Sequence, residues 1–204
     1  MNHKKGQNKP SNLTANPYII LVSGLPRSGT SMMMDMLQAG GITIHSDNQR
    51  KADEDNPKGY FEMERVKRIP DGDKVWLSGL NGKAIKIVAP FLTYLPVNLL
   101  YKVIFMQRDM DEILSSQILM LTRRNTGTEE ENEAKIKLIF QKSLVSVLAY
   151  MDKMPNFSYL ICEYSSIVKD PLPAINLIEE FLEIKLAKDD MAKRVDPGLY
   201  RQRK

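Results

Sequence analysis

The chain has 204 residues, 43% hydrophobic and 26% charged, which is typical of one globular domain and unlike a disordered or fibrous protein. The net charge of +4 is spread along the chain, so we expect no nucleic-acid partner, and no apolar run is long enough to span a membrane. A single cysteine, Cys162, excludes an internal disulfide and favours a cytoplasmic location. With two histidines and no ligand cluster, we expect no metal site.

The first sixteen residues are polar and basic and contain no apolar run of the kind found in a signal peptide. We therefore expect a disordered basic tail over residues 1–16 and a single domain over residues 17–204. The β-branched apolar run at 18–22 stops at a glycine and predicts a first strand that is covered on both faces. Methionines and leucine then recur at helical spacing until Gly40 and Gly41, which predicts a helix after the loop that follows this strand.

The remaining elements alternate between strands and helices. We expect a short strand at 42–44, an exposed loop over 46–59, and further strands at 84–88, 101–106 and 157–162. Helices are predicted over 110–122, 129–152 and 171–182. This alternation predicts an α/β protein with the three-layer fold of P-loop NTPases, in which helices flank a central parallel sheet and ligands bind at the carboxyl ends of the strands.

The loop between the first strand and the first helix has the spacing of a Walker A phosphate loop, from Gly24 to Gly29. Its backbone N–H groups and the N-terminus of the helix can hold a phosphate. Thr30 stands where a nucleoside triphosphatase has its lysine, so triphosphate chemistry lacks its main cation. Arg27, inside the loop, can instead engage a single phosphate with two donors. A glycine-rich turn without a ligand is the disfavoured alternative.

Residues 25–31 resemble the 5′-phosphosulfate loop of the sulfotransferase superfamily, whose donor is 3′-phosphoadenosine-5′-phosphosulfate (PAPS). The resemblance implies that the loop residues bind this donor, namely Arg27, Ser28, Gly29, Thr30 and Ser31. The family also binds the 3′-phosphate with an arginine just after a strand and a serine eight residues later, which matches Arg108 and Ser116. Eight residues are about two helical turns, so the two side chains can converge on one anion. The alternatives are an ion pair of Arg108 with a neighbouring aspartate and an unremarkable helical serine.

Other stretches extend the resemblance over about residues 18–201. Residues 55–62 resemble a segment common in bacterial sulfotransferase-like proteins, and residues 162–171 with 181–182 resemble the later strand, turn and helix of the family. Arg201 resembles part of a basic C-terminal segment that relatives place against the 3′-phosphate. A solvated basic tail is the alternative for this residue.

Sulfuryl transfer needs positioned cations and a base that takes the proton of the acceptor, and it requires no metal. Lys86 resembles the family's lysine that approaches the donor from a neighbouring strand. Val88 stands where cytosolic members have their catalytic histidine, so Glu62 is the preferred base and His45 the second choice. The alternative for Glu62, equally favoured, is a carboxylate that stabilises a helix N-terminus.

The resulting hypothesis is a PAPS-dependent sulfotransferase that acts on a hydroxyl or amine of a small molecule, glycan or peptide. One alternative is a P-loop small-molecule kinase with lid arginines at Arg123 and Arg124; another is an inactive nucleotide-binding module. The sequence leaves homo-oligomerisation open. Four aromatic residues either belong to the core, which is favoured, or line an apolar acceptor pocket: Phe61, Trp76, Phe91 and Tyr94.

Overall fold

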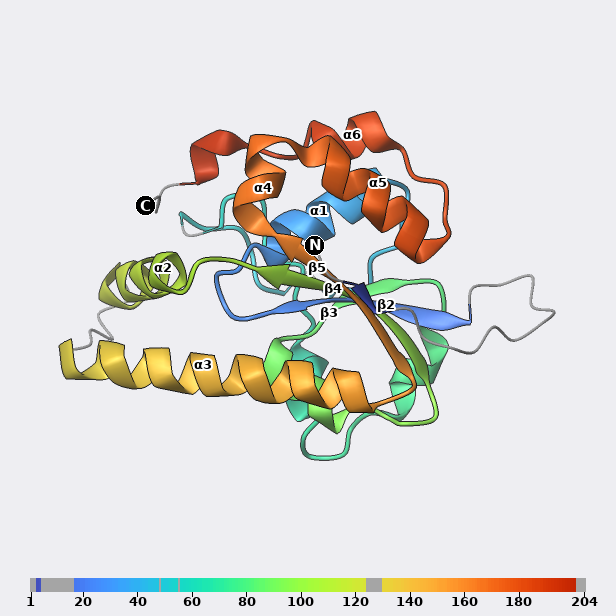
Figure 1. Ribbon diagram of the computed structural model, residues 1–204, viewed down its shortest axis with the longest axis horizontal. Coiled ribbons are helices and arrows are strands. Elements are labelled where there is room, and N and C mark those ends of the chain that lie inside the picture. The colour runs from blue at the N-terminus through green and yellow to red at the C-terminus, as the bar shows by residue number, and fades with distance from the viewer. Residues whose placement is uncertain (1–2, 5–16, 48, 55, 124–129, 201–204) are drawn as a thin grey trace.

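The computed structural model describes residues 3–4, 17–47, 49–54, 56–123 and 130–200 (Figure 1). Within these ranges the strands form one five-stranded sheet in the order β1-β5-β4-β2-β3. The strands are β1 (His3–Lys4), β2 (Tyr18–Gly24), β3 (Ala84–Lys86), β4 (Leu100–Gln107) and β5 (Phe157–Glu163). Strands β2 to β5 are parallel, and β1 pairs with β5 in the antiparallel direction. The carboxyl ends of the parallel strands therefore meet at one edge of the sheet.

Helices cover both faces of this sheet, as the sequence predicted. The α-helices are α1 (Thr30–Ala39), α2 (Met110–Arg123), α3 (Glu130–Lys153), α4 (Tyr164–Lys169), α5 (Pro171–Leu182) and α6 (Lys188–Ala192). Shorter 3₁₀ helices are η1 (Glu64–Arg68), η2 (Val75–Gly79), η3 (Ala89–Tyr94) and η4 (Pro197–Leu199). In Figure 1, α1, α4, α5 and α6 lie on one side of the sheet and α3 lies on the other. The three-layer α/β fold is thus confirmed.

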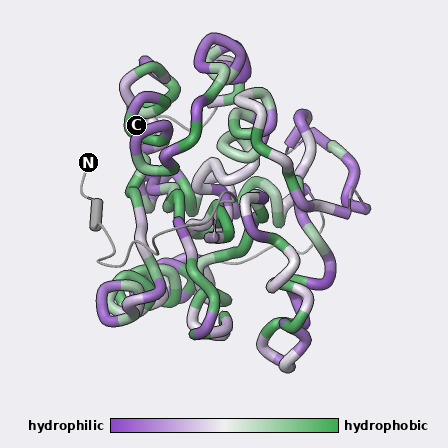
Figure 2. Tube along the Cα trace, turned by 90° about the vertical axis from the view of Figure 1, so that its right-hand side faces the viewer, coloured by the Kyte–Doolittle hydropathy of each residue, from purple (hydrophilic) through white to green (hydrophobic). Residues whose placement is uncertain are grey.

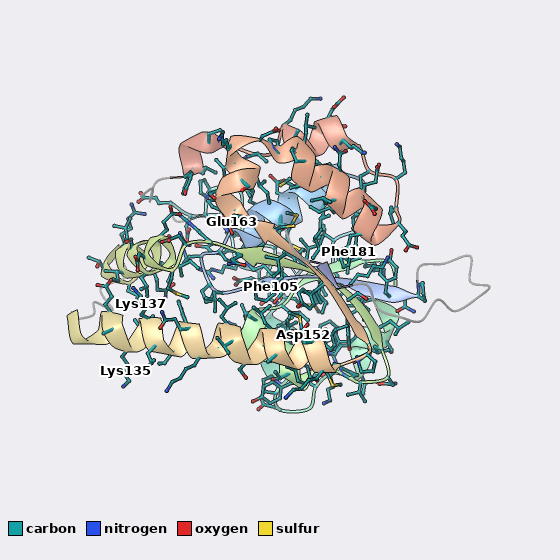
Figure 3. The ribbon with its side chains drawn as sticks, viewed as in Figure 1. Phe105, Lys135, Lys137, Asp152, Glu163 and Phe181 are labelled. Carbon is teal, nitrogen blue, oxygen red and sulfur yellow. The ribbon has the colours of Figure 1, made fainter. Side chains whose placement is uncertain are left out.

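The two faces of the sheet carry two separate hydrophobic clusters. In β2, Ile20 and Val22 pack with α1, α4 and α5, whereas Ile19 and Leu21 pack with η1, η2, η3 and α3. All four side chains are fully buried, which explains why the sequence reads as a continuous apolar run rather than an alternation. Phe105 lies at the centre of the sheet (Figure 3). Long hydrophilic stretches of the trace lie at the periphery of the molecule (Figure 2).

Helix α2 projects from the end of the sheet and lies beside α3 (Figure 1). Lys137 of α3 pairs with Asp111 of α2 at 2.6 Å, and it lies on the side of α3 that faces α2, whereas Lys135 lies on the opposite side (Figure 3). This packing places the cavity-lining side of α2 next to the carboxyl ends of the strands.

Several elements differ from the sequence prediction. Residues 42–44 form no regular strand; Ile44 makes an isolated parallel bridge to Ala84 instead. Strand β3 ends at Lys86 rather than at Val88, because η3 begins at Ala89 with a proline in its first turn. His3 and Lys4 pair with β5, whereas the rest of the tail predicted over 1–16 lies outside the described residues. Helices α4 and α6, of six and five residues, are too short to show a periodic pattern.

The C-terminal end of α5 is held against the sheet by two side chains. The Nζ of Lys102 in β4 donates to the carbonyl of Phe181 at 2.7 Å, and the hydroxyl of Tyr18 in β2 donates to the carbonyl of Leu182. The ammonium also lies 4.3 Å from the centre of the Tyr18 ring. These carbonyls belong to the last turn of a helix, where no intrahelical donor is available.

We expect Lys102→Met to lower the free energy of unfolding by about 1–3 kcal/mol, because a charged donor to a half-buried carbonyl is lost. Urea denaturation followed by circular dichroism measures this change. The matched control is Lys142→Met on the exposed side of α3, which should leave the midpoint unchanged. Equal midpoints for both variants would contradict the role given to Lys102.

Candidate functional site

A cavity of about 840 Å³ lies at the carboxyl ends of β2, β3 and β4. Its walls come from the loop after β2, the residues after β3 and β4, helix α2, η1 and the segment around η4. Of the lining residues that the structure describes, eight are basic and three are acidic. The basic residues are Arg27, Arg50, Lys58, Lys67, Lys86, Arg108, Arg123 and Arg194, and the acidic ones are Glu62, Glu64 and Asp196. This excess of positive charge suits a ligand with several negative charges.

The predicted phosphate loop forms the floor of this cavity. Helix α1 begins at Thr30, and the N–H groups of its first turn have no acceptor within the helix. Gly29 precedes it with φ 96°, and a Cβ at this position would lie 2.4 Å from the Tyr164 ring, so only glycine fits. Arg27 adopts φ 67°, a left-handed conformation that is uncommon for a side chain other than glycine. The loop thus brings a helix N-terminus and the Arg27 side chain into the lining of one cavity.

The two predicted anion sites meet in this cavity. The Nε of Arg27 donates to the Oγ of Ser116 at 2.9 Å, although the residues are 89 positions apart in the sequence. The Nη1 of Arg108 donates to the backbone carbonyl of Arg27 at 3.1 Å. The phosphate loop, the end of β4 and the buried face of α2 are therefore joined by direct contacts.

A further group of side chains surrounds Arg108. Its Nε pairs with Glu112 at 2.9 Å, and both side chains are more than nine-tenths buried. The hydroxyl of Tyr200 donates to the other oxygen of Glu112 at 2.6 Å, which raises the pKa of Tyr200 to about 12. The guanidinium faces the rings of Tyr164 and Tyr200, with distances to their centres of 4.7 and 5.3 Å. Sequence reasoning considered the neighbouring aspartates and missed Glu112, although its i,i+4 spacing on a helix was a usable signal.

Lys86 and Glu62, both predicted to be catalytic, are in contact. The Nζ of Lys86 donates to the Tyr60 carbonyl at 2.7 Å, to the Oγ of Ser31 at 3.2 Å and to Oε1 of Glu62 at 3.3 Å. Lys86 is 8% exposed, and this burial lowers its pKa, an effect that the nearby Glu62 carboxylate partly opposes. A buried ammonium thus lies between the phosphate loop and a carboxylate.

Arg50 also holds Glu62, and sequence reasoning did not identify it. Its Nη1 lies 3.2 and 3.1 Å from the two carboxylate oxygens, and the guanidinium lies 3.3 Å above the centre of the Tyr60 ring. Glu62 precedes η1 rather than beginning an α-helix, so its main contacts are these two cations. The loop that carries Arg50 shows no periodicity that would reveal where its side chains point.

The segment predicted as an exposed loop folds back onto the phosphate loop. The Nδ2 of Asn56 donates to the Oγ of Ser31 at 2.8 Å, and the hydroxyl of Tyr60 donates to the carboxylate of Asp53. The Nζ of Lys58 donates to the backbone carbonyl of Arg194 at 2.6 Å. Two segments far apart in the sequence therefore meet beside the cavity.

Not every predicted residue reaches the cavity. Of the described candidates, Ser28 is fully buried outside the lining, with its N–H bonded to the Leu25 carbonyl. His45 also lies outside the lining, with its ring 5.9 Å from that of Trp76; burial and the charge of Lys83 lower its pKa. Arg124 and Arg201 lie outside the described residues.

Among the four aromatic residues considered for an acceptor pocket, Phe91 lines the cavity. Phe61 and Trp76 pack against the two core clusters, and Tyr94 is 47% exposed. Within the described part of the chain, no helix combines the length and the apolar character that crossing a bilayer requires. The same residues contain no cluster of three side chains suited to holding a metal ion.

Comparisons with known proteins identify a family and similar folds. Residues 17–198 match the family described as "Sulfotransferase domain". Among solved structures, the chain is similar to sulfotransferase STF1 from Mycobacterium tuberculosis, with 16% identity and a TM-score of 0.57 over 89% of this chain and 71% of that one. It is also similar to the sulfotransferase domain of the Synechococcus olefin synthase, with 14% identity and a TM-score of 0.55 over 98% and 92% of the two chains.

A third similar structure is mouse sulfotransferase SULT7A1 complexed with PAP, with 21% identity and a TM-score of 0.51. The alignment covers 89% of this chain but 63% of the mouse chain, so this chain spans less than two thirds of that enzyme. At such identities the structural likeness concerns the fold. Among curated protein sequences, the comparison gives no match to this chain.

Proposed function

Because the chain belongs to the sulfotransferase domain family, and is a transferase by that membership, we propose that it moves a sulfuryl group from PAPS to a hydroxyl or amine of an acceptor. The observation that carries the proposal is the contact of Arg27 with Ser116 and of Arg108 with the Arg27 carbonyl. These contacts join a phosphate loop to a second cationic position within one cavity, which is what a nucleotide with two separate anionic groups requires.

The residues present fit such a donor. Gly29, Thr30 and Ser31 line the cavity where α1 begins, and the described basic side chains outnumber the acidic ones around it. The donor supplies an activated sulfuryl group, whose bond to the 5′-phosphate oxygen breaks as the acceptor atom bonds to sulfur. A kinase would need a lysine at position 30, whereas in this chain Lys86 of β3 donates to the Oγ of Ser31.

Each catalytic role follows from position and charge. The N–H groups at the start of α1 hold the 5′-phosphate, and Arg27 and Lys86 stabilise negative charge on its leaving oxygen. Since Lys86 is fixed by three hydrogen bonds, this stabilisation costs little reorganisation. Glu62, next to Lys86, takes the proton of the acceptor. The Arg50 guanidinium holds the carboxylate in place while this happens.

The acceptor lies along the part of the cavity beyond Arg27. Ser116 contacts Arg27, and Leu119 and Met120 lie one turn further along the same side of α2. Val88 and Phe91, which follow Lys86, also line the cavity. We therefore favour an acceptor with an apolar body and one reactive hydroxyl or amine.

We expect Leu119→Asp to raise the KM for an apolar acceptor such as 2-naphthol by about tenfold, because the charge disrupts the apolar wall. Leu119 is 36% exposed, so the substitution should leave folding intact. Steady-state kinetics with a saturating donor measures the effect. Val145→Asp, on an exposed position of α3 away from the cavity, is the matched control. An unchanged KM in the Leu119 variant would exclude this wall as the acceptor surface.

The transfer reaction itself is tested with PAPS labelled on sulfur and a panel of hydroxyl and amine acceptors. The proposal expects label on an acceptor, at a rate that depends on Glu62. Binding of the nucleotide without transfer to any acceptor would favour an inactive nucleotide-binding module. Transfer of the terminal phosphate of magnesium-ATP, with no sulfuryl transfer, would favour the kinase.

A further inference from the structure

The C-terminal segment reaches the second cationic position of the cavity. Asp196 and Leu199 line the cavity, and the segment is fastened to the opposite loop by the contact between Lys58 and the Arg194 carbonyl. It ends, within the described residues, at Tyr200, whose ring stands edge-on to the Tyr164 ring with the ring centres 5.3 Å apart. Tyr200 therefore brings the C-terminal segment next to Arg108, which directly follows β4 and lies more than 90 residues earlier in the sequence.

Two contacts fix the plane of the Arg108 guanidinium. Its Nε bonds to Oε2 of Glu112, and its Nη1 bonds to the Arg27 carbonyl. A guanidinium has five N–H donors in a rigid fork, so fixing two of them sets the direction of the others. The two tyrosine rings face the guanidinium and restrict its movement out of this plane.

Tyr200 also determines how Glu112 binds the arginine. A carboxylate and a guanidinium prefer to pair through two parallel hydrogen bonds, which would turn both oxygens of Glu112 toward Arg108. Here Oε1 of Glu112 accepts the hydrogen bond of the Tyr200 hydroxyl at 2.6 Å, and Oε2 accepts that of Arg108. The tyrosine thus holds one carboxylate oxygen of Glu112 while the arginine bonds to the other.

We propose that Glu112 and Tyr200 are positioning residues that aim Arg108 at the second anionic group of the nucleotide. The C-terminal segment then contributes to selectivity for a nucleoside bisphosphate over a monophosphate. This inference rests on the proposed function, because it takes the 3′-phosphate of the donor to be the group that Arg108 binds. Glu112 and Tyr200 act through Arg108 and need not touch the nucleotide.

The test is calorimetric titration with 3′-phosphoadenosine-5′-phosphate (PAP) and, separately, with adenosine 5′-phosphate, which lacks the 3′-phosphate. Tyr200→Phe keeps the ring and removes the hydroxyl. We expect it to weaken PAP binding by about tenfold, a typical size for the loss of coupling between residues in direct contact. Binding of adenosine 5′-phosphate should change less than twofold. In an Arg108→Ala background, Tyr200→Phe should have no further effect, because its action passes through the arginine.

Two further variants serve as a control and as a second test of the inference. Tyr159→Phe removes a similar hydrogen bond, from a tyrosine hydroxyl to Asp152 at 2.9 Å, far from the cavity lining, and should affect neither nucleotide. Glu112→Gln removes the negative charge and leaves one oxygen acceptor where the carboxylate has two. It should reproduce the loss of PAP selectivity even if Glu112→Ala proves unstable.

The inference is overturned if Tyr200→Phe weakens both nucleotides equally, or if it weakens PAP as much without Arg108 as with it. A wild-type protein that binds PAP no better than adenosine 5′-phosphate would overturn the proposed donor site and this inference together. A wild-type preference for PAP that both variants retain would overturn the inference alone.

Discussion

Glu62→Gln is expected to lower kcat for sulfuryl transfer by about 10²–10⁴-fold, the usual contribution of a general base, while PAP affinity changes less than twofold. Glutamine keeps the size of the side chain and an oxygen that can accept from Arg50 and Lys86, so the cavity should keep its shape. It cannot take a proton from the acceptor. Steady-state kinetics with labelled PAPS, together with calorimetry, separates these two effects.

Glu64 provides the matched control for this variant. It also lines the cavity, but its carboxylate pairs with Lys67 at 2.8 Å and is 61% exposed. Glu64→Gln should therefore keep nearly full activity. A Glu62→Gln enzyme with an unchanged kcat would show that another group, or water, takes the proton.

Lys86→Met is the second large effect, with an expected loss in kcat of about 10²–10³-fold, comparable to the removal of one preorganised charge from a transition state. The ammonium contacts Ser31 of the phosphate loop, the Tyr60 carbonyl and Glu62, and the side chain is buried. Because these groups lose a shared donor, thermal unfolding of the variant should be measured alongside its kinetics.

The pH profile distinguishes a catalytic Lys86 from a structural one. Burial lowers the pKa of Lys86, and the charges of Arg50 and Arg27 lower it further, whereas Glu62 opposes this change. The proposed role of Lys86 requires its protonated form, so we expect activity below this pKa and its loss as the pH rises through it. We expect Lys86→Arg, which remains charged at all accessible pH values, to remove the alkaline loss of kcat. An alkaline limb that is identical in this variant would contradict the role of Lys86.

The parts of the site that the sequence predicted have local signals. Gly24, Gly29 and the methionine spacing of α1 define a strand, loop and helix, and the eight-residue interval between Arg108 and Ser116 follows from helical geometry. The sequence placed Glu62 and Lys86 at one reacting centre without predicting a contact between them. In the structure, the Nζ of Lys86 lies 3.3 Å from Oε1 of Glu62.

The residues that the sequence did not reveal are held by long-range contacts. The position of Arg50 depends on the stacking against Tyr60 and on the bond from Asn56 to Ser31, and neither leaves a periodic trace in the sequence. Tyr200 meets Glu112 across 88 positions, a pairing that no local pattern encodes. Such contacts arise only when the sheet has brought the strand ends together, which is why the fold was easier to predict than the site.

The donor site is tested most directly by calorimetric titration of the protein with PAP, beside magnesium-ATP, repeated for Arg27→Ala and Arg108→Ala. We predict that the wild-type protein binds PAP in preference to magnesium-ATP and that each variant loses most of this affinity, because each removes a cation from one of the two anion sites. Preferential binding of magnesium-ATP, or PAP binding that survives both substitutions, would contradict the assignment of this cavity as a PAPS site.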